Sequence, residues 1–133
     1  MQVISFNNQY ATAPSRLMAF VIDHLVVSTV FCLLSWDFSW SLLGLGFWKL
    51  VLVFLYYAQM ESSRYQATFG KIAMGIKVTD EYGHRLDFSK ALLRNLSKIL
   101  SSAILGIGYI MILFDERNQG LHDKIADTLV VKQ

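Results

Sequence analysis

The sequence predicts an all-α membrane protein: an antiparallel hairpin of transmembrane helices, an amphipathic interfacial helix, and a third short or re-entrant membrane helix. A minor two-stranded β element on the cytoplasmic side completes the predicted fold. Of the 133 residues, 54% are hydrophobic, and the mean hydropathy of +0.41 is high for a soluble domain. The apolar residues also gather in runs close to the roughly 20 residues that a bilayer-crossing helix needs. Basic residues are concentrated between the second and third of these runs, as in membrane proteins with a defined orientation.

Two long apolar runs predict the hairpin, with spans at about residues 16–35 and 38–58. Trp36, Asp37 and Trp40 mark the turn between them, because Trp is enriched at the membrane interface. The first 15 residues contain no Lys or Arg, so we expect the first span to stay in the membrane rather than to be cleaved as a signal peptide.

A third apolar stretch, residues 99–114, is shorter than a full span and contains Gly106 and Gly108. We expect it either to cross a thin region of the bilayer or to enter and turn back as two half-helices. Residues 86–100 before it have the pattern of an amphipathic helix lying on a membrane surface, with Arg94 and Lys98 on its polar side.

The remaining polar regions are the segment 61–98 and the tail 115–133, and the chain 1–133 reads as a single domain. Residues 75–79 and 128–131 each resemble a short strand, and we expect them to pair because lone strands are unstable. The segment 61–98 holds seven basic residues, whereas the turn between the first two spans holds none. The positive-inside rule therefore predicts that this segment, the N-terminus and the tail are cytoplasmic.

Several classes of function are disfavoured. A net charge of +2 offers little attraction to nucleic acid, and the spacing around Gly70 and Lys71 is not that of a phosphate-binding loop. No second His or Cys lies at ligand spacing from His122 and Asp123, so neither a metal nor a cofactor is expected. No nucleophile, base and acid can be combined into a catalytic set, and we expect no enzyme. The lone Cys32 is interpreted as a packing residue.

The chain resembles the RDD family of small membrane proteins, named for one arginine and two aspartates. Arg16 and Asp23 in the first span are similar to the family's first helix. Later positions that carry the resemblance are Gly70, Lys71, Arg94, His122, Asp123 and Thr128. The resemblance implies a multi-pass protein, expected in a bacterial inner membrane, for which transport of ions or small solutes is suggested. Lys49 in the second span is not part of the family pattern.

The resemblance and the composition leave two functions open. The first is a carrier or channel in which Asp23 and Lys49, with His24 as a weaker candidate, meet monovalent cations or protons. Because so few spans cannot enclose a pore, this function requires a homo-oligomer or another membrane protein. Membrane lipids are a further expected partner. The alternative is a non-catalytic accessory or scaffold protein that binds another membrane protein.

The ionisable residues at membrane depth each have a functional and a structural interpretation. Asp23 is either an ion or proton site or half of a buried ion pair, with equal weight. Depth along two antiparallel helices predicts Lys49 as its partner, while His24 points about 100° away from it. For Arg16 the favoured interpretation is snorkelling to lipid phosphates, with a reach toward Asp23 as the alternative. Arg94 is expected to be an interfacial charge, and His122 with Asp123 a hydrogen-bonded cap that orders the tail.

Overall fold

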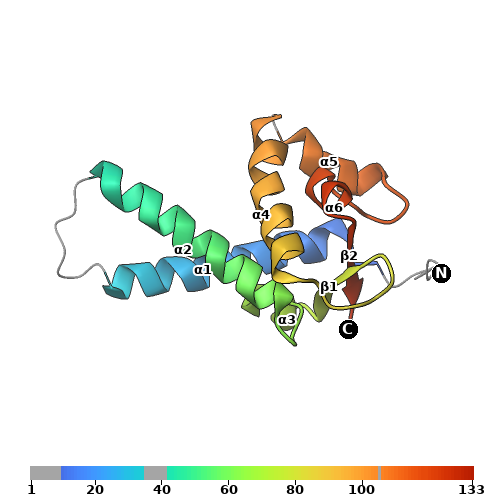
Figure 1. The fold of residues 1–133 in the computed structure, drawn as a ribbon, viewed down its shortest axis with the longest axis horizontal. Coiled ribbons are helices and arrows are strands. Elements are labelled where there is room, and N and C mark those ends of the chain that lie inside the picture. The colour runs from blue at the N-terminus through green and yellow to red at the C-terminus, as the bar shows by residue number, and fades with distance from the viewer. Residues whose placement is uncertain (1–9, 35–41, 105) are drawn as a thin grey trace.

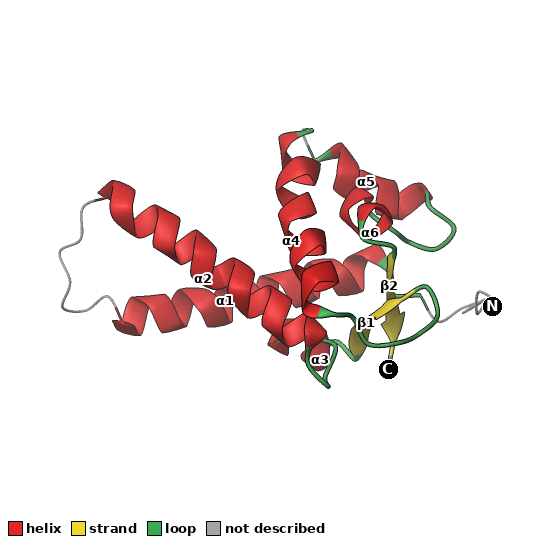
Figure 2. Cartoon of the chain, viewed as in Figure 1, coloured by secondary structure: helices red, strands yellow, loops and turns green. Residues whose placement is uncertain are grey.

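The computed structural model describes residues 10–34, 42–104 and 106–133, which form a mostly helical molecule with one small sheet (Figure 1, Figure 2). In chain order the elements are α1 (Ala13–Leu34), α2 (Leu42–Ser62), α3 (Phe69–Ala73), β1 (Ile76–Asp80), α4 (Phe88–Ala103), α5 (Ile107–Phe114), α6 (Leu121–Ile125) and β2 (Thr128–Lys132). The predicted turn at Trp36, Asp37 and Trp40 lies outside the described residues. The short helices α3 and α6, which sequence patterns did not predict, each come just before a strand.

The long helices α1 and α2 run in opposite directions, and the C-terminal half of α1 and the N-terminal half of α2 extend away from the rest of the molecule (Figure 1). Their outward side chains are large and apolar; Leu33, for example, is 74% exposed. Within the described part of the chain, residues 13–33 form a helix long and apolar enough to cross a membrane, and the bent pair α4 and α5 would supply another if it acted as one span. Exposed apolar side chains of this kind suit a helix that lies in lipid.

Helix α4 is amphipathic, as predicted, but its polar side faces the protein and its apolar side faces outward. The residues that it buries are Ala91, Arg94, Asn95, Ser97 and Ser101. The exposed ones include Leu93, Leu96, Ile99 and Leu100. The expectation that Arg94 is an interfacial charge is therefore wrong. An apolar face gains nothing by turning inward when its surroundings are lipid, so the polar face can be used for contacts within the protein.

The third apolar stretch is broken where the glycines predicted. Helix α4 ends at Ala103 and α5 begins at Ile107. The helix direction bends by 102° between them. Gly106 adopts φ +76°, a left-handed conformation that other residues rarely tolerate. The break near Gly106 is thus confirmed, although residue 105 itself lies outside the described chain.

Strands β1 and β2 pair antiparallel, with Val78 opposite Val130, which confirms the predicted pairing to within a residue at the strand ends. The N-terminal arm joins the same sheet, because the backbone N–H of Ala11 donates to the carbonyl oxygen of Val130 at 2.8 Å. Both ends of the described chain are thereby tied to one small sheet (Figure 2). The buried apolar residues around it are Ala11, Ala19, Ala58, Ile76, Val78, Leu86, Ala91 and Val130.

Candidate functional site

A network of charged side chains, which we call the charge network, lies buried where α2, α4 and α6 meet. At its centre the guanidinium of Arg94 binds two carboxylates. Its Nη1 donates to both oxygens of Glu61, at 2.7 and 2.8 Å, and its Nε donates to Oδ1 of Asp123 at 2.8 Å. All three side chains are almost completely inaccessible to solvent. Hydrogen bonds between an ionised donor and an ionised acceptor, as here, are among the strongest polar contacts in proteins.

Two further cations extend the charge network to α1 and α3. Arg16 Nη1 donates to Oδ2 of Asp123 at 2.5 Å, although the two residues are 107 positions apart in the chain. Lys71 forms an ion pair with Glu61. Arg16 therefore does not snorkel toward lipid phosphates, and that interpretation is wrong. The charge network joins α1, α2, α3, α4 and α6, so it connects both ends of the chain.

Glu61 has two weaker neighbours on α4. Asn95 Nδ2 donates to Oε2 of Glu61 at 3.2 Å, and the ammonium of Lys98 lies 3.9 Å from Oε1. The Lys98 ammonium also lies over the ring of Tyr57, 4.6 Å from its centre, where a cation is attracted by the aromatic face.

Two residues of α6, Asp123 and His122, have lowered pKa values. Burial by itself raises the pKa of Asp123, but the positive charges of Arg94 and Arg16 outweigh this effect and hold the pKa well below its usual range. His122 beside it is buried against the ring of Tyr109, and burial lowers the pKa of His122 to about 3. At neutral pH the network thus contains an ionised Asp123 next to a neutral imidazole. The backbone N–H of Gly120 also donates to Asp123, which agrees with the predicted cap.

A second polar cluster surrounds Asp23 in the middle of α1. Its carboxylate accepts a 2.5 Å hydrogen bond from the Thr68 hydroxyl, a 2.8 Å bond from the backbone N–H of Gly70 and a 3.3 Å bond from the Tyr56 hydroxyl. Gly70 permits this contact because a Cβ atom there would lie 2.0 Å from the carbonyl oxygen of Ala19. Glycine is therefore needed at this position because α3 approaches α1 closely, and not because the backbone forms a turn there.

The predicted ion pair between Asp23 and Lys49 is wrong. Lys49 lies over the ring of Phe31, with its ammonium 5.5 Å from the ring centre. His24 is exposed and stacks on Phe20. Equal depth in two helices does not place two side chains on facing sides, and α3 occupies the side of α1 on which Asp23 lies.

A pocket of about 860 Å³ adjoins both polar clusters. Its inner end is polar and is lined by Arg16, Asp23, Lys71, Arg94, Asn95, Lys98 and His122. Its outer walls are apolar and include Leu17, Phe20, Val53, Phe54, Ile99, Ile110 and Leu113. A volume of this size is near the upper end of the ~300 to 1,000 Å³ typical of ligand sites. We call this the main pocket.

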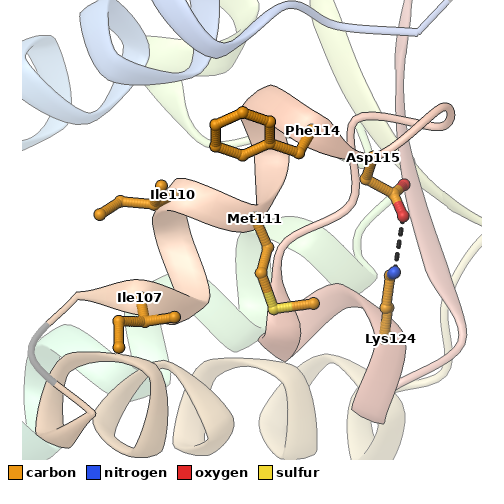
Figure 3. A pocket seen from close by; sticks show the side chains of 6 residues that line it. All are labelled: Ile107, Ile110, Met111, Phe114, Asp115 and Lys124. Atoms are coloured by element: carbon orange, nitrogen blue, oxygen red, sulfur yellow. Dashed lines mark ion pairs between the residues drawn. The ribbon is translucent and has the colours of Figure 1, made fainter.

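A smaller pocket of about 350 Å³ lies on the other side of α5 and has fewer ionisable side chains in its lining (Figure 3). Apart from Ile107, Ile110, Met111 and Phe114, it has only Asp115 and Lys124, which point toward each other and are already paired at 2.6 Å. The residues that the structure describes contain no group of three His, Cys, Asp or Glu arranged to hold a metal ion.

The three groups of residues that carried the family resemblance therefore meet in space. Arg16 and Asp23 come from α1, Lys71 from α3 and Asp123 from α6, and all four lie in the charge network or beside the main pocket. The sequence model of the RDD family matches residues 10–127. The chain belongs to the RDD family. The remaining position singled out in this RDD protein, Thr128, is a buried residue at the start of β2.

Two relatives from Bacillus subtilis (strain 168) are similar to this RDD protein. The uncharacterized membrane protein YteJ is 29% identical over an alignment of 135 positions that covers 93% of this chain and 82% of YteJ. The uncharacterized protein YxaI is 43% identical over 82 residues, which cover 62% of this chain and 54% of YxaI. The matched region thus spans about half the length of YxaI. No solved structure matches this chain.

Sequence patterns missed Glu61, the residue that joins three cations of the site. The second span was expected to end at about residue 58, and Glu61 was assigned to the polar segment after it. Helix α2 continues to Ser62 instead. The absence of Gly or Pro between residues 58 and 62 is the signal that could have extended the helix. Sequence patterns also did not indicate that the Tyr56 hydroxyl donates a hydrogen bond to Asp23.

Proposed function

We propose that this RDD protein is a multi-pass membrane protein that transports ions or small solutes, and that the main pocket is its solute site. The observation that carries the proposal is the main pocket itself, which leads from an apolar, exposed outer wall to ionisable side chains at its inner end. Ionisable residues at membrane depth are costly and usually belong to a solute or proton pathway. Asp23 lines the main pocket and is the residue at which a cation or proton would be exchanged.

The topology in this proposal has α1 and α2 crossing a bacterial inner membrane, while α4 and α5 enter and leave it on one face. Pairing of β1 with β2 supports this arrangement, because the segment between the two strands must begin and end on the same side. The N-terminal arm, residues 61–98 and the tail would then all be cytoplasmic. A Lys132→Cys change in a Cys32→Ser background tests this, and the new thiol should resist an impermeant reagent in intact cells. Ready labelling from outside would overturn the orientation.

We propose further that the protein acts as a homo-oligomer or with another membrane protein. The main pocket opens along one side of the helices, so a closed path needs surfaces from a second chain. The exposed apolar side chains of α2, such as Trp48 and Leu50, offer such a surface. The mass of the protein in lipid nanodiscs tests this, and a fully active monomer would overturn the proposal.

Flux into liposomes tests transport directly. Purified protein is reconstituted, and movement of Na⁺, K⁺ and protons and of a small organic acid is measured. The comparison is between the wild-type protein, Asp23→Asn and Thr29→Val, a control on the exposed face of the same helix. Asp23→Asn should abolish flux while Thr29→Val leaves it unchanged. Absence of flux in the wild-type protein would overturn transport and favour the accessory role, in which residues 61–98 and the tail bind another membrane protein.

A further inference from the structure

The main pocket combines two features that together specify a ligand: an unsatisfied cationic end and a long apolar wall. Nε and Nη2 of Arg16 are buried and have no hydrogen-bond partner, although the same guanidinium binds Asp123 through Nη1. The Arg16 side chain is only 10% exposed, so bulk water is largely excluded from it. Buried donors without acceptors are destabilising, and native structures rarely leave them so without a reason. An acceptor group in the main pocket would satisfy them.

The acceptor is expected to be negatively charged. Four basic side chains, those of Arg16, Lys71, Arg94 and Lys98, line the main pocket. They outnumber by one the three carboxylates near them, which belong to Asp23 in the lining and to Glu61 and Asp123 behind it. Asp23 already accepts three hydrogen bonds, so it does not compete strongly for these cations. Guanidinium groups bind carboxylate and phosphate with particularly good geometry.

The rest of the main pocket is suited to an apolar chain rather than to a small ion. An inorganic anion would fill little of about 860 Å³. The outer wall includes Leu17, which is 63% exposed, and Leu113, which is 65% exposed. In a membrane protein these side chains meet lipid, so a ligand can enter sideways from the bilayer without passing through water.

We propose that the main pocket binds an anionic membrane lipid, with its acidic headgroup at Arg16 and Lys98 and one apolar chain along the wall formed by α1, α4 and α5. The inference goes beyond the proposed exchange of a cation or proton at Asp23, because it assigns a separate, anionic ligand to the Arg16 side of the same pocket. The shared chemistry is a carboxylate or phosphate joined to a single long alkyl chain.

Equilibrium binding to the purified full chain in detergent, followed by native mass spectrometry, tests this proposal. The probes share a sixteen-carbon chain and differ at the head: palmitate, lysophosphatidic acid, lysophosphatidylcholine and hexadecanol, with inorganic phosphate as a head without a chain. The two acidic lipids should bind about tenfold tighter than the zwitterionic and neutral ones, as expected for a charged hydrogen bond. Equal binding of palmitate and hexadecanol, or tight binding of inorganic phosphate, would overturn the proposal.

Two variants test where in the main pocket the ligand binds. Arg16→Gln should weaken palmitate binding about tenfold and leave hexadecanol unchanged. Because Arg16 also binds Asp123, a second variant avoids the charge network: Leu17→Trp fills the mouth of the main pocket from an exposed position. Its control is Leu33→Trp on the same helix, at a similarly exposed site away from the main pocket. Leu17→Trp should abolish binding and Leu33→Trp should not, and equal binding by both would refute the assignment.

Binding is measured without any gradient, so its outcome is separate from that of the flux assay. Acidic lipids bound without flux would overturn transport and leave the lipid site standing. Cation or proton flux without binding of acidic lipids would overturn the lipid site and leave transport standing.

Discussion

Replacement of Arg94 by leucine tests whether the charge network holds the helices together. Among the residues that the structure describes, Arg94 is the one whose side chain hydrogen-bonds to both Glu61 and Asp123. Its loss would leave each carboxylate with another cation, Lys71 for Glu61 and Arg16 for Asp123. We therefore expect a loss of about 3 to 5 kcal/mol in the free energy of unfolding, the range for one broken buried ion pair, rather than twice that amount.

The measurement is equilibrium unfolding in mixed micelles followed by circular dichroism. Lys90→Leu is a matched control, because Lys90 lies one turn earlier on α4 and is only partly buried. Its replacement should change the free energy of unfolding by less than about 0.5 kcal/mol. Arg94→Lys should fall between the two, since an ammonium keeps the charge but cannot bridge both carboxylates in the same geometry. If Arg94→Leu costs no more than about 1 kcal/mol, as for an exposed pair, the charge network does not hold the helices together.

Three further outcomes follow from the same structure. The native His122 binds a proton only near pH 3, whereas the unfolded chain does so near 6.5, so stability should fall by about 1.4 kcal/mol per pH unit as the pH drops between these values. His122→Gln should flatten this dependence in unfolding curves measured from pH 7 to pH 5. Thr68→Val removes the hydroxyl that donates to Asp23 and should cost about 1.5 to 3 kcal/mol in the same unfolding assay. Gly70→Ala should destabilise by about 1 to 3 kcal/mol or more, because the new methyl group collides with the backbone of Ala19.

Each of these outcomes has a control or a result that would contradict it. A pH dependence that is unchanged in His122→Gln would show that another group causes it. Thr29→Val changes an exposed hydroxyl of α1 in the same chemical way, and a loss equal to that of Thr68→Val would show that the bond to Asp23 adds nothing. If Gly70→Ala is as stable as wild type, α3 can move away from α1 at no cost.

The parts of the fold that local patterns determine could be predicted from the sequence. Long apolar runs gave the two extended helices, Gly106 gave the break between α4 and α5, and two short β-rich segments gave the sheet. Each of these signals lies within a few consecutive residues and depends little on the rest of the chain. The short helices α3 and α6 lack such a signal, because five residues are too few for a helical period to be visible.

The candidate site was predicted as a set of residues but not as a set of contacts. The family resemblance singled out Arg16, Asp23 and Asp123, yet the pairs among them depend on which face each helix presents. Depth along the membrane suggested Lys49 for Asp23, whereas the actual donors come from α3 and from Tyr56. Arg94 was expected outside because the amphipathic pattern of α4 has the same period whichever of its faces is turned inward.

The link between Arg16 and Asp123 also has a consequence for how the protein is made. During synthesis Arg16 leaves the ribosome 107 residues before its partner does. At about 5 to 20 residues per second, Asp123 is added on the order of 5 to 20 s after Arg16. Glu61 is synthesised earlier, so Lys71 and Arg94 can each find a carboxylate as soon as they appear. The ion pair between Arg16 and Asp123 can thus form only late in synthesis. A nascent chain that stops before Asp123 carries an Arg16 charge without this partner, which disfavours movement of the start of α1 across the membrane.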